Sequence, residues 1–186
     1  MKTYKCLTVQ KFNSSDYYIH AIQPDEIEKI RLWRNMQMQV LRQTKKISPE
    51  EQKLYYENNI WPGMMKYHPK EILFSFFLKN EMIGYGGLVN INWHHKRAEV
   101  SFLLNPERVI DVDCYSVDFS SFLGLIKLMS FEYLKLNRLF TETYEFRVDH
   151  ISILESNNFN LEGILKKHIL QDGKYINSLL HGFVNE

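Results

Sequence analysis

Three consecutive apolar segments joined by short polar turns constrain most strongly how this chain can fold. They span residues 71–80 (EILFSFFLKN), 81–93 (EMIGYGGLVNINW) and 97–105 (RAEVSFLLN). Their lengths and their aromatic and β-branched residues are typical of strands, and such short connections force neighbouring strands to run antiparallel. The middle of the chain therefore predicts a three-stranded antiparallel sheet.

Further elements follow one another around this sheet. Ser48, Pro49 and Glu51 form a capping box at a helix start, and Asp172–Gly173 is typical of a hairpin turn. The pattern predicts a strand at 16–22, helices at 24–35 and from 48, a long helix from about Ser116, a strand at 138–146, a helix at 147–159 and a hairpin at 160–185. We therefore expect an α+β sandwich in which helices flank one mixed, largely antiparallel sheet, formed by a single domain over residues 1–186.

The composition excludes several classes of protein. A formal net charge of +1 without a basic run argues against a nucleic-acid partner. The longest apolar run, residues 72–78, is too short to span a bilayer, and the first 16 residues contain no apolar signal-peptide core. Two distant cysteines suggest neither disulfides nor a zinc site, and His94–His95 lack a third metal ligand at any recognisable spacing. We expect a cytoplasmic protein with no metal and no membrane insertion.

The order of elements resembles that of the GCN5-related N-acetyltransferase (GNAT) superfamily. IGYGGLV followed by AEVSFLLNPER is similar to two central strands of that family. The C-terminal region resembles the branch related to ribosomal-protein N-terminal acetyltransferases, with Asn158–Phe159, Glu162–Gly163 and Asp172–Gly173 at the positions of its motif. LWRN at 32–35, with ISPEEQ downstream, resembles enzymes that acetylate amino groups of nucleotide-linked sugars. The resemblance covers residues 17–184.

This resemblance implies transfer of an acetyl group from acetyl-CoA to the primary amine of a small molecule. A carboxylate must remove a proton from the amine, and Glu99 in AEVSFLL matches the family's catalytic glutamate. The alternative is a solvent-facing strand residue paired with Arg97 or Lys96. The backbone of Phe102, Leu103 and Leu104 occupies the stretch that the family uses to bind pantetheine as an added strand, although these side chains can also be plain core.

Two positions depart from the family's pattern. The tyrosine that usually protonates the leaving thiolate is replaced by Leu154. Tyr144 or Ser156 can take its place, or the thiolate can leave unprotonated. The asparagine that opens the last helix in many members is replaced by Arg147, which suits a phosphate or a solvated helix start.

The resemblance also implies that the first helix and the loop after it form one wall of the acceptor site. Arg34 and Arg42 suit bidentate recognition of phosphate in a nucleotide sugar. Trp33 can stack on a sugar or base, or lie in the core. His94 can act as an auxiliary base near neutral pH, or be a plain polar turn residue.

The loop that normally binds the CoA pyrophosphate is the largest departure. No glycine occurs between Gly87 and Gly124, and the family's glycine positions are held by Tyr115, Val117 and Phe119. The segment carries three aspartates, and its only cation is Arg108. Either the helix start near Ser116 still supplies amide and hydroxyl donors, with Arg108 nearby, or the CoA site is lost.

Three functions therefore compete. We expect an acetyl-CoA-dependent N-acetyltransferase, with a nucleotide-linked amino sugar as one acceptor. The alternatives are a protein N-terminal acetyltransferase and a non-catalytic binding module of the same fold. A homodimer is expected because edge strands in this fold often pair between subunits.

Overall fold

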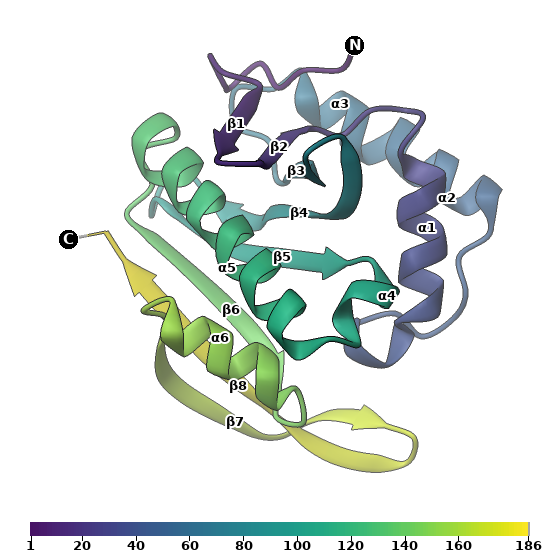
Figure 1. The fold of residues 1–186 in the computed structure, drawn as a ribbon, viewed down its shortest axis with the longest axis vertical. Coiled ribbons are helices and arrows are strands. Elements are labelled where there is room, and N and C mark those ends of the chain that lie inside the picture. The colour runs from purple at the N-terminus through teal and green to yellow at the C-terminus, as the bar shows by residue number, and fades with distance from the viewer. Residues whose placement is uncertain (186) are drawn as a thin grey trace.

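The computed structural model describes residues 1–185, which form a single eight-stranded mixed sheet (Figure 1). The strand order is β1-β2-β3-β4-β5-β6-β8-β7, and only β5 and β6 pair in parallel. The strands are β1 (Lys11–Ser14), β2 (Tyr17–Ala21), β3 (Ile72–Leu78), β4 (Glu81–Asn92), β5 (Arg97–Leu104), β6 (Arg138–Tyr144), β7 (Asn160–Gln171) and β8 (Lys174–Val184). The predicted fold class is confirmed.

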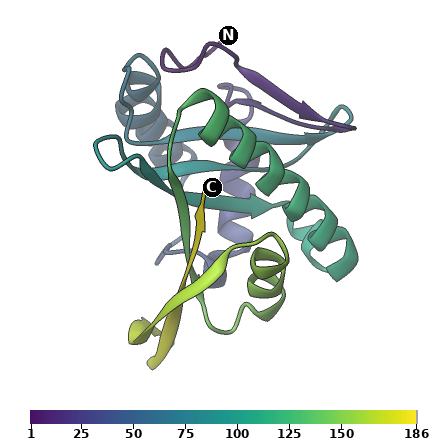
Figure 2. The ribbon, with the colours of Figure 1, turned by 90° about the vertical axis from the view of Figure 1, so that its left-hand side faces the viewer.

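Helices cover both faces of this sheet, with α5 and α6 on one side and α1 to α3 on the other (Figures 1 and 2). The side chains of Phe76 and Phe102 point toward Phe122 of α5. The helices are α1 (Ile27–Met36), α2 (Pro49–Tyr55), α3 (Trp61–Met64), α4 (Pro106–Val109), α5 (Val112–Leu128) and α6 (Val148–Ser156), with 3₁₀ turn η1 (Met38–Val40) and π turns η2 (Tyr56–Ile60) and η3 (Met129–Tyr133). Among residues 1–185, none of these helices combines the length and the apolar character needed to cross a membrane.

Local sequence signals placed several elements correctly. The Ser48 hydroxyl accepts a hydrogen bond from the Glu51 amide and the Glu51 side chain accepts one from the Ser48 amide, as the capping box predicts. Asp172 and Gly173 both have positive φ, 49° and 76°, as a tight hairpin turn requires. These short-range motifs carry their own partners, so they form as expected.

Two elements and two helix starts differ from the prediction. The polar strand β1 and the short helix α4 were not expected, and α1 begins at Ile27 instead of Pro24. The long helix α5 begins at Val112, because the Asp111 carboxylate accepts a hydrogen bond from the Cys114 amide and caps the helix there. The prediction of a start near Ser116 is therefore wrong by one turn.

Close packing around β4 fixes its position between β3 and β5. Gly87 has a φ of +148°, and a Cβ there would collide with the Ile72 carbonyl of β3. A Cβ on Gly86 would collide with the Ser101 carbonyl of β5 and lie 2.8 Å from the Phe122 ring. These two glycines let α5 and both neighbouring strands approach the centre of the sheet.

Candidate active site

The central feature of the molecule is a cleft where β5 and β6 separate. The strands pair only at Arg97–Glu99 and Arg138–Phe140, and beyond this point they diverge (Figure 1). A cavity of about 190 Å³ lies between them, lined by residues of both strands, including Glu99, Phe102, Thr141 and Tyr144. A second cavity of about 210 Å³ shares four lining residues with the first, Val40, Phe102, Arg147 and His150. The two cavities form one cleft along β5.

The walls of this cleft offer polar groups to an extended ligand. On the side facing β6, strand pairing of β5 stops at Glu99, so Val100–Leu104 present a strand edge there. The Leu104 carbonyl accepts a hydrogen bond from Gln37 Nε2 at 2.8 Å. The buried Thr141 hydroxyl has no hydrogen-bond partner within residues 1–185. A pantetheine arm, with its two amides and thioester, fits such an edge by pairing as a strand does.

Glu99 lies inside the cleft and not on the solvent face. Its side chain is 10% exposed, and Asn90 Nδ2 donates to Oε2 at 2.7 Å. Arg42 Nη2 donates to Glu99 Oε1 and to Glu142 Oε2, both at 3.0 Å. Asn90 has a φ of +50° at the irregular end of β4, which allows it to reach Glu99. The alternative pairing of Glu99 with Arg97 or Lys96 is therefore wrong.

Tyr144 lines the same cavity as Glu99. Burial raises the pKa of its phenol, with Arg42 opposing and Glu142 adding to the shift, so Tyr144 holds its proton at neutral pH. Ser156, the other candidate acid, instead donates to the Ser152 carbonyl on the exposed surface of α6. Leu154, at the position of the family's usual acid, is fully buried in the core.

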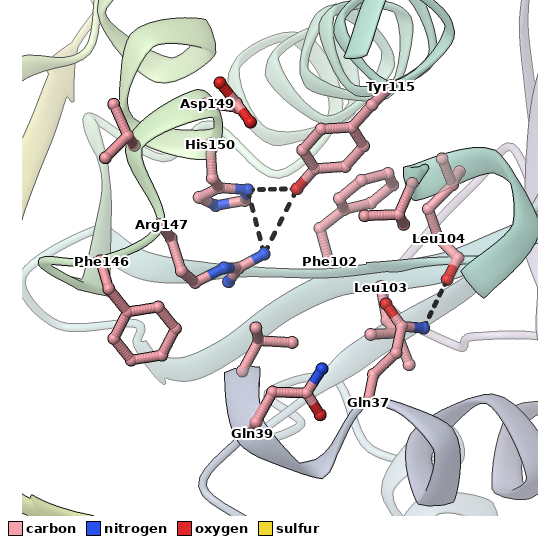
Figure 3. A pocket seen from close by; sticks show the side chains of 13 residues that line it. Gln37, Gln39, Phe102, Leu103, Leu104, Tyr115, Phe146, Arg147, Asp149 and His150 are labelled. Atoms are coloured by element: carbon pink, nitrogen blue, oxygen red, sulfur yellow. Dashed lines mark hydrogen bonds between the residues drawn. The ribbon is translucent and has the colours of Figure 1, made fainter. Parts of the chain in front are cut away.

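A hydrogen-bonded cluster of three side chains, which the sequence did not predict as a cluster, lies between α5 and α6 (Figure 3). Arg147 Nη2 lies 3.3 Å from both His150 Nδ1 and the Tyr115 hydroxyl oxygen. Because arginine only donates, Nδ1 is an acceptor, and Tyr115 donates its hydroxyl proton to it at 2.6 Å. Burial, with Arg147 and His181 nearby, keeps the pKa of His150 well below its usual range. The imidazole is therefore neutral and holds Tyr115 and Arg147 in place.

A larger cavity of about 500 Å³ opens between the sheet and α1–α2. It shares Arg34, Val89 and Ser101 with the cleft, so the two are neighbours across β4 and β5. Arg34 donates to the Tyr85 hydroxyl at 2.7 Å and to Gln43 Oε1 at 3.2 Å. The cavity therefore lies next to the predicted reaction centre.

One carboxylate in this cavity has no cationic partner. The Tyr55 hydroxyl donates to Glu71 Oε2 at 2.9 Å, and Glu71 is half-buried in the cavity wall. No ion pair within residues 1–185 includes Glu71. Burial, followed by the charge of Glu71, raises the pKa of Tyr55, so the phenol remains a donor. Glu71 therefore lines the cavity as a carboxylate outside any ion pair, although Arg34 and Lys45 line the same cavity.

The remaining predicted residues are arranged differently from expectation. The Trp33 ring is buried in the core, where Lys29 lies over it, so it is not available to stack on a substrate. His94 lines a separate cavity near the N-terminal segment and not the cleft with Glu99. Leu103 and Leu104 line the second part of the cleft, although both side chains are buried.

The two predicted phosphate ligands also have other roles. Ser116 lies in the second turn of α5, where its amide is inside the helix and not at its start. Arg108 binds the buried carboxylate of Asp118 through two hydrogen bonds, of 2.6 and 3.1 Å. Neither Ser116 nor Arg108 therefore has the free donor groups on which its predicted role in phosphate binding rested.

Comparisons with known proteins agree with this architecture. The family model described as "Acetyltransferase (GNAT) domain" matches residues 19–180. Spermidine N-acetyltransferase from Vibrio cholerae, in complex with CoA and spermine, superimposes with a TM-score of 0.78 at 19% identity, covering 92% of this chain and 96% of that one. A dodecameric structure of spermidine N-acetyltransferase from the same organism gives 0.74 at 18% identity, covering 92% and 95%. A putative acetyltransferase gives 0.69 at 15% identity, covering 95% and 87%.

The structural likenesses establish the fold, and the family model covers most of the chain. Neither addresses the branch related to ribosomal-protein or amino-sugar acetyltransferases, which remains a prediction. The chain belongs to the acetyltransferase (GNAT) domain family and is an N-acetyltransferase of that type.

Proposed function

We propose that this N-acetyltransferase uses acetyl-CoA to acetylate a small aliphatic amine carrying more than one positive charge, such as a polyamine. The observation that carries this proposal is Glu71, a carboxylate without a cationic partner within residues 1–185 that lines the cavity beside the cleft. A distal ammonium group can bind Glu71 while the reacting amine lies near Glu99. The similar enzymes from Vibrio cholerae, named for spermidine, support the same class of acceptor.

The arginines argue against a nucleotide sugar as acceptor. Arg34 already donates to Tyr85 and Gln43, and Arg42 is bound between Glu99 and Glu142. A phosphate would have to displace these partners. An ammonium group of the acceptor, by contrast, is a cationic donor like the Arg42 guanidinium. Glu99 and Glu142 can accept hydrogen bonds from either cation.

The proposed mechanism uses groups that line the cleft. Glu99 accepts a proton from the ammonium, directly or through one water, and the neutral nitrogen attacks the carbonyl carbon of the thioester. The C–N bond forms, the C–S bond breaks, and Tyr144 donates its phenolic proton to the departing thiolate. The nitrogen then loses its second proton, which restores the Tyr144 phenol through water, and Glu99 releases its proton to solvent. The exposed edge of β5 positions the donor.

Initial rates with acetyl-CoA and a panel of acceptors test this proposal. The panel comprises spermidine, a monoamine of similar chain length, a nucleotide-linked amino sugar and a peptide with a free N-terminus. We expect the highest kcat/KM for spermidine. A preference for the nucleotide sugar or the peptide would overturn the proposed acceptor class.

The variant Glu71→Gln tests the role of the carboxylate itself. Removing the charge should raise KM for spermidine about tenfold, the cost of one charge-assisted hydrogen bond, and leave the monoamine's KM unchanged. Glu57→Gln, an exposed carboxylate on η2, is the matched control. Equal losses for spermidine and the monoamine would assign Glu71 a structural role instead.

A homodimer remains part of this proposal. The terminal hairpin exposes the apolar side chains of Leu161, Ile164, Leu170 and Tyr175, and β7 forms one edge of the sheet. Sedimentation equilibrium should give a mass of at least twice 22.3 kDa. Ile164→Glu should lower that mass, and a wild-type monomer at micromolar concentration would contradict the proposal.

A further inference from the structure

We propose that Arg147, and not the start of α5, binds the phosphate of the acyl donor. This inference rests on the proposed use of acetyl-CoA. It concerns how a chain with a glycine-free loop recognises the negatively charged part of that donor.

The start of α5 is already occupied by an anion of the protein itself. Asp111 Oδ1 accepts a hydrogen bond from the Cys114 amide at 3.0 Å. Asp113 adds a second exposed carboxylate in the first turn. A helix start binds phosphate through free amides and a positive local potential, and these two aspartates oppose both.

Arg108 is also engaged. Its guanidinium forms a bidentate pair with Asp118, and the Tyr17 hydroxyl donates to the same carboxylate at 2.8 Å. Asp118 is only 1% exposed, so its charge requires a cation beside it. Arg108 cannot turn to a phosphate without leaving that buried carboxylate unpaired.

Arg147, unlike the start of α5 and unlike Arg108, is not occupied by a carboxylate of the described chain. It lines both parts of the cleft, and no carboxylate of residues 1–185 lies within 4.0 Å of its guanidinium. Asp149 lines the same cavity but forms no ion pair with it. The hydrogen bonds of the Arg147 side chain within the described chain involve Nη2 alone, which leaves Nε and Nη1 to donate elsewhere. A planar fork of this kind suits a phosphate group.

Tyr115 and His150 act as positioning residues for Arg147. Both side chains are buried, and the neutral imidazole accepts from the phenol and from the guanidinium (Figure 3). Tyr115 lies in the first turn of α5, so this end of the helix contributes a positioning residue for Arg147. Arg147 lines the cavity that contains Leu103 and Leu104 as well as the cavity that contains Glu99. A donor with its thioester beside Glu99 and its pantetheine arm along Val100–Leu104 therefore extends past this guanidinium toward its phosphates.

Isothermal titration with CoA, 4′-phosphopantetheine and pantetheine tests this assignment. Arg147→Ala should weaken both phosphate-bearing ligands about ten- to a hundredfold, as loss of a charge-assisted contact does, and leave the Kd of pantetheine unchanged. Asp111→Asn is the matched variant, because asparagine preserves the helix cap while removing the charge. If Arg147 is the phosphate ligand, Asp111→Asn should leave CoA affinity within about twofold of wild type.

Each contrary outcome has a distinct meaning. Equal weakening of all three ligands by Arg147→Ala would show a structural role, and no weakening would exclude the residue. A clear gain in CoA affinity in Asp111→Asn would return the phosphate site to α5. In these cases the proposed use of acetyl-CoA survives. A wild-type protein that binds neither CoA nor pantetheine would overturn the proposed function together with this assignment.

Discussion

Glu99 is held in the cleft by one cation and one amide, and these contacts decide what a substitution there will do. Asn90 binds one carboxylate oxygen and Arg42 the other. Glutamine has nearly the same shape, so it can keep the Asn90 contact, while Arg42 keeps its bond to Glu142. A glutamine at this position therefore removes the carboxylate, the proposed proton acceptor, without removing the packing.

For Glu99→Gln we expect kcat to fall at least about a hundredfold, the usual contribution of a general base. The melting temperature should stay close to that of wild type. Steady-state kinetics with the preferred amine and thermal unfolding give both quantities. Glu107→Gln, an exposed carboxylate on α4, should change neither. Unchanged turnover in Glu99→Gln would remove Glu99 from the mechanism.

At the scale of helices and strands, the elements that formed as predicted are those whose signals lie within a few residues. The capping box at Ser48 and the turn at Asp172–Gly173 are examples. The start of α5 was misplaced because Asp111 and Ser116 are equally good caps by residue type. Only the surrounding structure, in which Arg108 and Tyr17 both reach Asp118, distinguishes them.

The same distinction applies to the candidate site. Glu99 was identified because a strand context of seven residues carries its signal. Arg34 also bonds Tyr85, and Arg42 bonds Glu99 and Glu142. These three partners lie 51 to 100 residues away, so their contacts could not be read from the chain. His150 was missed for the same reason. Its partner Tyr115 lies 35 residues away. The sequence drew attention to Tyr115 only as a replacement for a family glycine.

Arg108 of α4 and Tyr17 of β2 both donate to the buried carboxylate of Asp118 on α5. Asp118→Ala should lower the free energy of unfolding by about 3 kcal/mol, because it leaves Arg108 without its partner. The double variant Arg108→Leu, Asp118→Leu should recover most of that loss, since it leaves no unpaired charge. Asp113→Ala, exposed on the same helix, should stay within about 0.5 kcal/mol of wild type. Urea unfolding measures all four proteins, and a small loss in Asp118→Ala would show that the pair does not stabilise α5.

Across the protein as a unit, His20 and His150 make the free energy of unfolding depend on pH in opposite directions. Burial opposes the charged form of His20, but its hydrogen bonds with Glu26 and the Ala21 carbonyl outweigh it and raise its pKa. Stability from His20 is therefore complete below its ordinary pKa of about 6.5 and is lost as pH rises through the raised value. The lowered pKa of His150 acts in the other direction. Its contribution is complete above about pH 6.5 and is lost as pH falls toward that lowered value.

The free energy of unfolding should therefore be greatest near about pH 6.5. Between about pH 6 and 5, His20 is largely protonated in both states and contributes little slope, and the carboxylates are still mostly ionised. The slope there belongs to His150 and should approach about 1.4 kcal/mol per pH unit, the value for one proton taken up on unfolding. His150→Gln removes that proton, and its amide oxygen can still accept from Tyr115. Urea unfolding across this range should show a flat acid limb in His150→Gln and an unchanged one in His20→Gln, whereas the wild-type slope in His150→Gln would mean that another group drives the acid loss of stability.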